Sequence, residues 1–204
     1  MSVVQVKICG ITRLEDGLAV AGLGADAVGF NFWPRSRRYI TPEAAAPLIS
    51  ALPAGVLAVG VFVDPDRETL LRAIATSGVG AVQLHGDEPP ELCLGLPVPV
   101  VKGIRVKDAH SLAQLASYEV AGFLLDSATP GYGGSGTAFD WSLAAEAADS
   151  VPVWLAGGLT PENVGEAVRR VRPRGVDVAS GVESAPGVKD LEKVAAFIRN
   201  AKGA

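Results

Sequence analysis

An aspartate followed by a glycine-rich segment combines residue types suited to acid chemistry beside a phosphate. The apolar run 123–125 is short enough for a buried strand, and it ends at Asp126. Four glycines follow within residues 131–136, and their backbone N–H groups can converge on an anion. Asp140 is then expected to cap a helix that begins at Trp141. This order of strand, acid, glycine-rich loop and helix predicts a catalytic acid next to a phosphate site.

Two other interpretations of the same loop remain open. Residues 131–136 match the spacing G-x-G-x-x-G of dinucleotide-binding proteins, but that fingerprint belongs to the first strand-to-helix turn. It also requires an acid at the end of the following strand, and the strand expected at 151–156 ends in Gly157 and Gly158. The loop could also be a glycine-rich turn that binds nothing.

Composition excludes several classes of protein. The chain has 204 residues, of which 49% are hydrophobic and 20% charged, which suits one well-buried domain. Its net charge of −4 argues against nucleic acid or an anionic membrane as a partner. Cys9 and Cys93 do not make a disulfide scaffold, and we find no membrane span or signal peptide. A cytoplasmic location is expected.

Strand and helix patterns alternate eight times along the chain. The expected strands cover residues 3–7, 27–32, 56–63, 81–84, 98–102, 123–125, 151–156 and 176–179. The expected helices cover 13–23, a segment capped by Thr41, 66–76, 88–94, 108–118, a segment capped by Asp140, 160–170 and 190–202. Strands that are apolar on both faces indicate a parallel sheet covered by helices. We therefore predict a single (β/α)8 barrel, an α/β fold, as one domain over residues 1–204, with a doubly wound open sheet as the alternative.

A barrel brings the carboxyl ends of all its strands to one mouth. Cys9, His85 and Asp126 would meet there, and the glycine-bearing loops after the last three strands would form a phosphate site. Cys9 could instead be an inert buried thiol, and His85 a loop residue that only forms hydrogen bonds. Lys102, at another strand end, could act as a Schiff-base lysine. No cluster of His, Cys and Asp has metal-ligand spacing, so no metal is expected.

Eight motifs occur in the order typical of one enzyme family. They are residues 7–12 (KICGIT), 24–30 (GADAVGF), 36–40 (SRRYI), 82–86 (VQLHG), 125–126 (LD), 132–136 (YGGSG), 157–159 (GGL) and 180–183 (SGVE). On these motifs the whole chain resembles phosphoribosylanthranilate isomerase of tryptophan biosynthesis. Ala156 stands where many members have Ser, and Asn31 replaces a common apolar residue; neither change touches the expected acid or base.

The resemblance implies a reaction and a set of residue roles. The reaction is the Amadori rearrangement of N-(5-phosphoribosyl)anthranilate to 1-(2-carboxyphenylamino)-1-deoxyribulose 5-phosphate, without a cofactor. Asp126 would be the general acid, Cys9 the general base, and Arg38 the partner of the anthranilate carboxylate. Gln83 and His85 are expected to bind substrate as well. The phosphate would be held by Gly134, Ser135, Gly136, Gly157, Gly158, Ser180 and Gly181.

Other functions of the same fold stay open at this point. Another phosphosugar isomerase or lyase would need a metal or a further catalytic Lys or Glu, and a barrel that only binds a phosphorylated ligand would need neither Cys9 nor Asp126. The expected partner is a small phosphorylated molecule, with no nucleic acid or membrane, and the chain is expected to be a monomer or homodimer.

Overall fold

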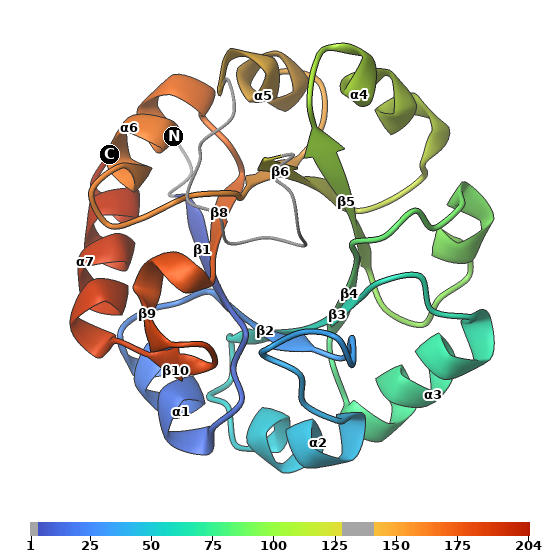
Figure 1. Cartoon of the computed structure of the whole chain (residues 1–204), viewed down its shortest axis with the longest axis vertical. Coiled ribbons are helices and arrows are strands. Elements are labelled where there is room, and N and C mark those ends of the chain that lie inside the picture. Colours follow the sequence, from blue (N-terminus) through green and yellow to red (C-terminus); the bar gives the residue numbers. More distant parts are fainter. Residues whose placement is uncertain (1–3, 128–140) are drawn as a thin grey trace.

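Eight parallel strands close into a barrel. The computed structural model describes residues 4–127 and 141–204. Each strand pairs with the next, and the last pairs with the first, so the open-sheet alternative is wrong. Helices surround this ring of strands (Figure 1). The strands are β1 (Gln5–Cys9), β2 (Ala27–Asn31), β3 (Leu57–Phe62), β4 (Ala81–Leu84), β5 (Val100–Val106), β6 (Gly122–Ser127), β7 (Val153–Leu155) and β8 (Gly175–Val178).

Alternation along each strand decides which side chains reach the barrel interior. In β1, Val6 and Ile8 are fully buried in the main hydrophobic core between strands and helices. Lys7 and Cys9 therefore point to the opposite face, into the barrel. The register places Lys7 beside Asp177 of β8, so both charges lie inside. The barrel interior is thus polar toward the carboxyl ends of its strands, where chemistry is expected.

Of the two predicted helix caps, Thr41 is confirmed by a hydrogen bond, and Asp140 lies outside the described residues. Thr41 accepts from the backbone N–H of Ala44 at 3.1 Å, as a side-chain cap with Pro42 at the first helical position. Asp66 and Asp190 cap their helices in the same way. The helices are α1 (Leu14–Gly22), α2 (Pro42–Ser50), α3 (Arg67–Ser77), α4 (His110–Ala113), α5 (Trp141–Ala148), α6 (Val164–Val171) and α7 (Leu191–Lys202). None of the helices in the described ranges is long and apolar enough to cross a membrane.

Three predicted helices were wrong in extent. The segment 88–94 forms only the 3-10 turn η1 (Pro90–Cys93), because two consecutive prolines remove backbone donors. The segment 108–118 divides into α4 and the 3-10 turn η2 (Gln114–Ser117), neither of which has a fully buried residue to stabilise a longer helix.

The third helix begins later than its sequence pattern suggests. Helix α6 starts at Val164 and not at Thr160, because the Asn163 side chain accepts from the Thr160 N–H at 2.8 Å. The same side chain donates to the carbonyl of Gly158 at 2.9 Å. These bonds hold a turn that the Thr-Pro-Glu pattern did not predict.

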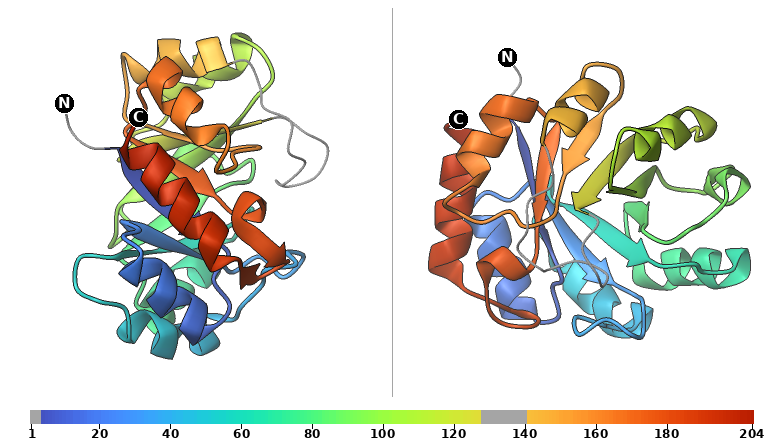
Figure 2. Two further views of the ribbon diagram at one scale, coloured as in Figure 1. Left: turned by 90° about the vertical axis from the view of Figure 1, so that its left-hand side faces the viewer. Right: turned by 45° about the horizontal axis from the view of Figure 1, so that its top comes forward.

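A short hairpin after β8 was also not predicted. The chain passes through the 3-10 turn η3 (Ser180–Val182) into two antiparallel strands, β9 (Glu183–Ala185) and β10 (Val188–Lys189). Figure 2 shows this hairpin at the end of the barrel away from the C-terminus. The Thr12 hydroxyl donates to the Gly187 carbonyl at 2.8 Å, which ties the hairpin to the loop after β1.

Lys102 and Glu88 form an ion pair buried among the loops after β3 and β4. Their nitrogen and oxygen are 3.0 Å apart, and the residues are 1% and 2% exposed. Lys102 also donates to three backbone carbonyls, and Glu88 accepts from the N–H groups of Asp64 and Gly86. In the sheet register Lys102 lies beside Leu84, out of phase with the cavity side chains, so it faces away from the barrel interior.

We predict that replacing Lys102 alone destabilises the protein strongly. Lys102→Met leaves the Glu88 carboxylate buried and without its cation, which costs about 3–5 kcal/mol. Urea unfolding measures this loss. The double variant Lys102→Met with Glu88→Gln should recover part of it, because no unpaired charge remains. A loss below about 1 kcal/mol in the single variant would contradict the assignment of this pair as a structural constraint.

Candidate active site

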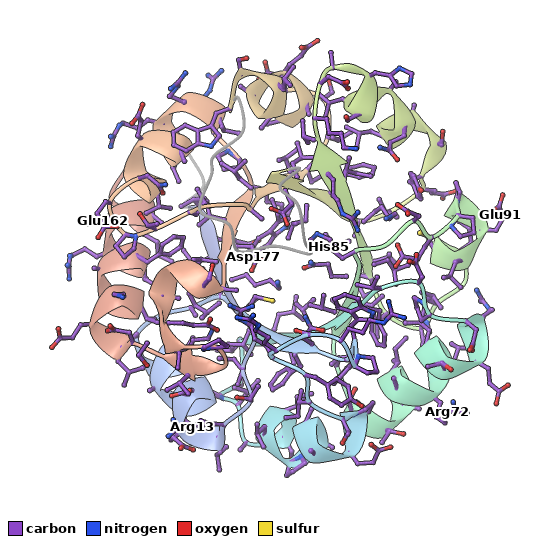
Figure 3. The ribbon with its side chains drawn as sticks, viewed as in Figure 1. Arg13, Arg72, His85, Glu91, Glu162 and Asp177 are labelled. Carbon is purple, nitrogen blue, oxygen red and sulfur yellow. The ribbon has the colours of Figure 1, made fainter. Side chains whose placement is uncertain are left out.

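One cavity of about 350 Å³ opens at the carboxyl ends of the strands. Its volume lies within the range that small-molecule sites usually have. In Figure 3, His85 and Asp177 lie inside the ring of strands, whereas Arg13, Arg72, Glu91 and Glu162 lie outside it. The described residues predicted for the site all line this cavity: Cys9, Arg38, Gln83, His85, Asp126, Gly157, Gly158, Ser180 and Gly181.

Cys9 is the last residue of β1, and its thiol fits against a glycine. A Cβ on Gly29, its neighbour in the sheet register, would lie 2.7 Å from the Cys9 Sγ and 3.2 Å from the Lys7 Nζ. Glycine is required there by the close approach of the sulfur. Burial raises the pKa of the Cys9 thiol, and the positive charges of Lys7 and Lys189 oppose that rise. The thiol is therefore mostly protonated at rest but lies beside cations that stabilise a thiolate.

Lys7 and Asp177 form an ion pair beneath that thiol. The Lys7 Nζ donates to the Asp177 Oδ1 at 2.9 Å, and both residues are buried. Burial favours the neutral amine, but the charges of Asp177 and Cys9 outweigh it and raise the pKa of Lys7. Lys7 therefore stays a cation inside the barrel.

Gln83, His85 and Asp126 form a chain of side-chain contacts across β4 and β6. The Gln83 Nε2 lies 2.7 Å from the His85 Nδ1, and the His85 Nε2 lies 3.3 Å from the Asp126 Oδ2. An amide N–H can only donate, so Nδ1 accepts and the proton of neutral His85 lies on Nε2, facing Asp126. The other oxygen of Asp126, Oδ1, is buried without a hydrogen-bond partner among the described residues. Asp126 is 7% exposed and lines the cavity, so its carboxyl group lies where a ligand in that cavity could approach it.

Arg38 is held by a carboxylate from the hairpin. Its Nε lies 2.8 Å from the Glu183 Oε1, and its Nη2 lies 2.6 Å from the Glu183 Oε2. This paired contact raises the pKa of Arg38. Burial alone would raise the pKa of Glu183, but Arg38 and Lys189 lower it overall, so the pair is ionised.

Two glycine-bearing loops border the cavity beside β7 and β8. Gly157 and Gly158 both have positive φ, +83° and +66°, which side chains rarely adopt. Ser180 and Gly181 begin η3 on the neighbouring loop. Backbone N–H groups of such turns suit an anion. Of the other predicted phosphate residues, Gly134, Ser135 and Gly136 lie outside the described residues.

Sequence reasoning missed the charged residues around these side chains. Lys7, Asp177, Glu183 and Lys189 were not given roles, although a lysine and an aspartate inside two apolar strands are a signal that buried charges must pair. Lys189 also has a buried partner. Its Nζ donates to the Cys9 carbonyl at 2.6 Å and to the Glu183 Oε1 at 2.8 Å. Within residues 4–127 and 141–204, no group of three His, Cys, Asp or Glu side chains could hold a metal ion.

Comparison with known proteins gives one consistent family. Residues 6–200 match the family model described as N-(5'phosphoribosyl)anthranilate (PRA) isomerase. An N-(5'-phosphoribosyl)anthranilate isomerase of Myxococcus xanthus is 53% identical over 204 residues, which cover 98% of this chain and 96% of that protein. The protein of the same name from Geobacter sulfurreducens is 51% identical, over 98% of this chain and 99% of its own length.

Solved structures agree with the sequence relatives. Phosphoribosyl anthranilate isomerase from Thermotoga maritima superposes with a TM-score of 0.94 at 48% identity, covering 98% of this chain and all of that one. A second such enzyme, in complex with reduced 1-(o-carboxyphenylamino)-1-deoxyribulose 5-phosphate, gives a TM-score of 0.90 at 45% identity and the same coverage. With its barrel fold and nearly full-length relatives, the chain belongs to the N-(5'-phosphoribosyl)anthranilate isomerase family.

Proposed function

We propose that the isomerisation of N-(5'-phosphoribosyl)anthranilate, the step of tryptophan biosynthesis that defines this family, takes place in the cavity at the carboxyl ends of the strands. The observation that supports this most directly is that Cys9 and Asp126, a potential base and a potential acid, line the same cavity. They come from β1 and β6, and glycine-bearing loops border the same space. A turnover assay tests the proposal, because the fluorescence of the anthranilate substrate changes as product forms.

Asp126 acts first, as the general acid. Its protonated carboxyl group donates to the ribose ring oxygen, and the bond between that oxygen and C1′ breaks. The anthranilate nitrogen supplies the electron pair, so that C1′ and nitrogen become an iminium. His85 orients the carboxyl group through Oδ2, and Gln83 fixes the tautomer of His85. No cofactor is needed, because the iminium nitrogen of the substrate itself accepts the electrons of the C2′–H bond.

Cys9 acts second, as the general base. Its thiolate removes the proton from C2′, and the electrons of that bond neutralise the iminium to give an enolamine, which tautomerises to the ketone. The iminium is positive and lies close by, so it favours the thiolate over the thiol. The positive intermediate and Lys7 both lower the pKa of Cys9, whereas burial raises it.

Arg38 and the glycine-bearing loops hold the two ends of the substrate. Arg38 presents a planar guanidinium, which matches the anthranilate carboxylate in shape and charge. Gly157, Gly158, Ser180 and Gly181 bind the phosphate through backbone N–H groups and the serine hydroxyl, with Gly134, Ser135 and Gly136 as further proposed ligands.

Alternative chemistry on Lys102 is disfavoured. A lyase that relied on this lysine would need its amine at the cavity, but Lys102 is buried against Glu88 and faces the helices. A barrel that only bound its ligand would not need the acid and base that the cavity brings together.

The setting of the reaction is part of the same proposal. We infer a cytoplasmic enzyme that binds a small phosphorylated molecule and neither nucleic acid nor membrane, which its net charge of −4 supports. It works as a monomer or homodimer; one structural relative, from Thermotoga maritima, is described as dimeric.

Cys9→Ser should lower kcat by about 10²–10⁴-fold, the usual worth of general acid–base catalysis. In the unmodified enzyme, kcat/KM should rise with pH toward the raised pKa of Cys9, because only the thiolate accepts a proton. The serine variant should lose that rise. Steady-state rates across pH measure both effects, with circular dichroism as the control for folding. A folded variant with unchanged kcat would refute the role of Cys9.

Asp126→Asn should lower kcat and kcat/KM together by a large factor, because the amide cannot donate a proton as the acid does. Binding of a product analogue should remain. If Asp126 only orients the loop that follows it, the variant would instead raise KM and keep kcat close to normal. Measuring both constants separates these two roles.

Ser180→Asp should raise KM by at least about tenfold. The variant removes the hydroxyl that would donate to the phosphate, and it puts a negative charge at the phosphate site. Ser180→Asn is the neutral control of similar size and should raise KM much less. Inhibition by inorganic phosphate should weaken in the same order. Equal KM values for the two variants would place the phosphate elsewhere.

A further inference from the structure

We infer that Glu183 is a positioning residue that fixes Arg38 relative to Cys9, and thereby makes the enzyme selective for substrates that carry the aryl carboxylate. The inference rests on the proposed role of Arg38 in binding that carboxylate. It adds a residue that does not touch the substrate but determines where the carboxylate, and hence C2′, must lie.

The contact between Glu183 and Arg38 uses one edge of the guanidinium. Three hydrogen bonds, at 2.6, 2.8 and 3.1 Å, join the Nε and Nη2 of Arg38 to the two carboxylate oxygens. The contact does not use Nη1, and Arg38 lines the cavity. A guanidinium held by one edge keeps its plane and direction, so its other edge is ready for a second carboxylate.

Glu183 is itself fixed by groups other than Arg38. Its Oε1 accepts from the Lys189 Nζ at 2.8 Å and from the Gly187 N–H at 3.2 Å. The Lys189 Nζ also donates to the Cys9 carbonyl at 2.6 Å. A continuous series of bonds therefore runs from Arg38 through Glu183 and Lys189 to the backbone of the proposed base.

The alkyl chain of Arg38 packs closely against the loop that follows β1. The loop after β1 places Gly10 at a φ of +81°, and a Cβ at that position would collide with the Arg38 side chain. The alkyl part of Arg38 thus packs on the residue next to Cys9, and its head is held by Glu183. Both ends of Arg38 are therefore held in position relative to Cys9 and Gly10.

The position of Arg38 should affect kcat/KM only for a substrate whose carboxylate binds Arg38. We compare kcat/KM for N-(5'-phosphoribosyl)anthranilate with kcat/KM for the analogue made from aniline, which lacks the carboxylate. Glu183→Gln keeps the size of the side chain but can accept through only one oxygen and has no charge. The ratio of the two kcat/KM values should fall by about tenfold, the usual effect of losing a charge-assisted hydrogen bond.

Further variants test whether Glu183 acts through Arg38. Arg38→Met should collapse the ratio, and adding Glu183→Gln to it should reduce the ratio no further, because the two residues act through the same contact. The matched control is Glu68→Gln on α3, which breaks an exposed ion pair with Arg72 at 3.2 Å and should leave both rates unchanged. If Glu183→Gln does not fold because Lys189 has lost its partner, Glu183→Gln with Lys189→Met removes both charges and should show the same loss of selectivity.

Each outcome has one meaning. If Glu183→Gln lowers the rates for both substrates equally, the residue is only structural and the inference is overturned. If the variant binds the carboxylate substrate more tightly, Glu183 competes with substrate for Arg38, which also overturns it. If Arg38→Met leaves the ratio unchanged, the proposed role of Arg38 fails, and the inference fails with it.

Discussion

Buried charges inside and around the barrel constrain the arrangement of its loops. An ionised side chain that loses water must find an opposite charge and further hydrogen bonds, or the fold loses several kcal/mol. Lys7 meets Asp177 across the β1–β8 pairing, and Lys102 meets Glu88 below the loop after β4. Lys7 and Asp177 are 170 positions apart, and Lys102 ties the loop after β4 to β5, so satisfying these charges also helps to set the positions of the loops that border the cavity.

The same pairs adjust the chemistry of the site. Lys7 is needed by Asp177 as a counterion, and it also lies close enough to Cys9 to oppose the effect of burial on the thiol pKa. On the opposite side of the cavity, His85 contacts Asp126 through a nitrogen whose proton is placed there by Gln83. The base and the acid thus have different neighbours: Lys7 and Lys189 lie near Cys9, whereas His85 contacts Asp126, which suits their opposite proposed duties.

Much of this arrangement could be predicted from the sequence. Apolar strands alternating with capped helices were enough for the barrel, and residues at strand ends, such as Cys9 and Asp126, could be placed at the mouth by topology alone. The extents of weak helices could not be predicted, because they depend on packing that a local pattern does not contain. Helix α6 is an example: its start depends on a contact between Asn163 and Gly158 that propensity does not describe.

The partners of charged residues were also beyond sequence reasoning. Glu183 was visible only as the end of a motif, and Lys189 had no motif at all, because the hairpin that brings them to Arg38 and Cys9 has no strong strand pattern. Periodicity indicates which face of a strand a side chain takes, but not which residue from a distant loop will meet it. The pairing of β8 with β1 is the exception. A closed barrel brings its first and last strands together, and their register places Asp177 beside Lys7.

That pairing also bears on how the protein is made. The bonds from Lys7 to Asp177 and from Lys189 to the Cys9 carbonyl join residues 170 and 180 positions apart. A chain that emerges from the ribosome in order exposes β1 long before β8 exists, and domains fold as units once their segments are available. During most of synthesis Lys7 therefore has no Asp177 and must remain in water. The surroundings of Cys9 form among the last contacts of the barrel, so translation must be nearly complete before the site can exist.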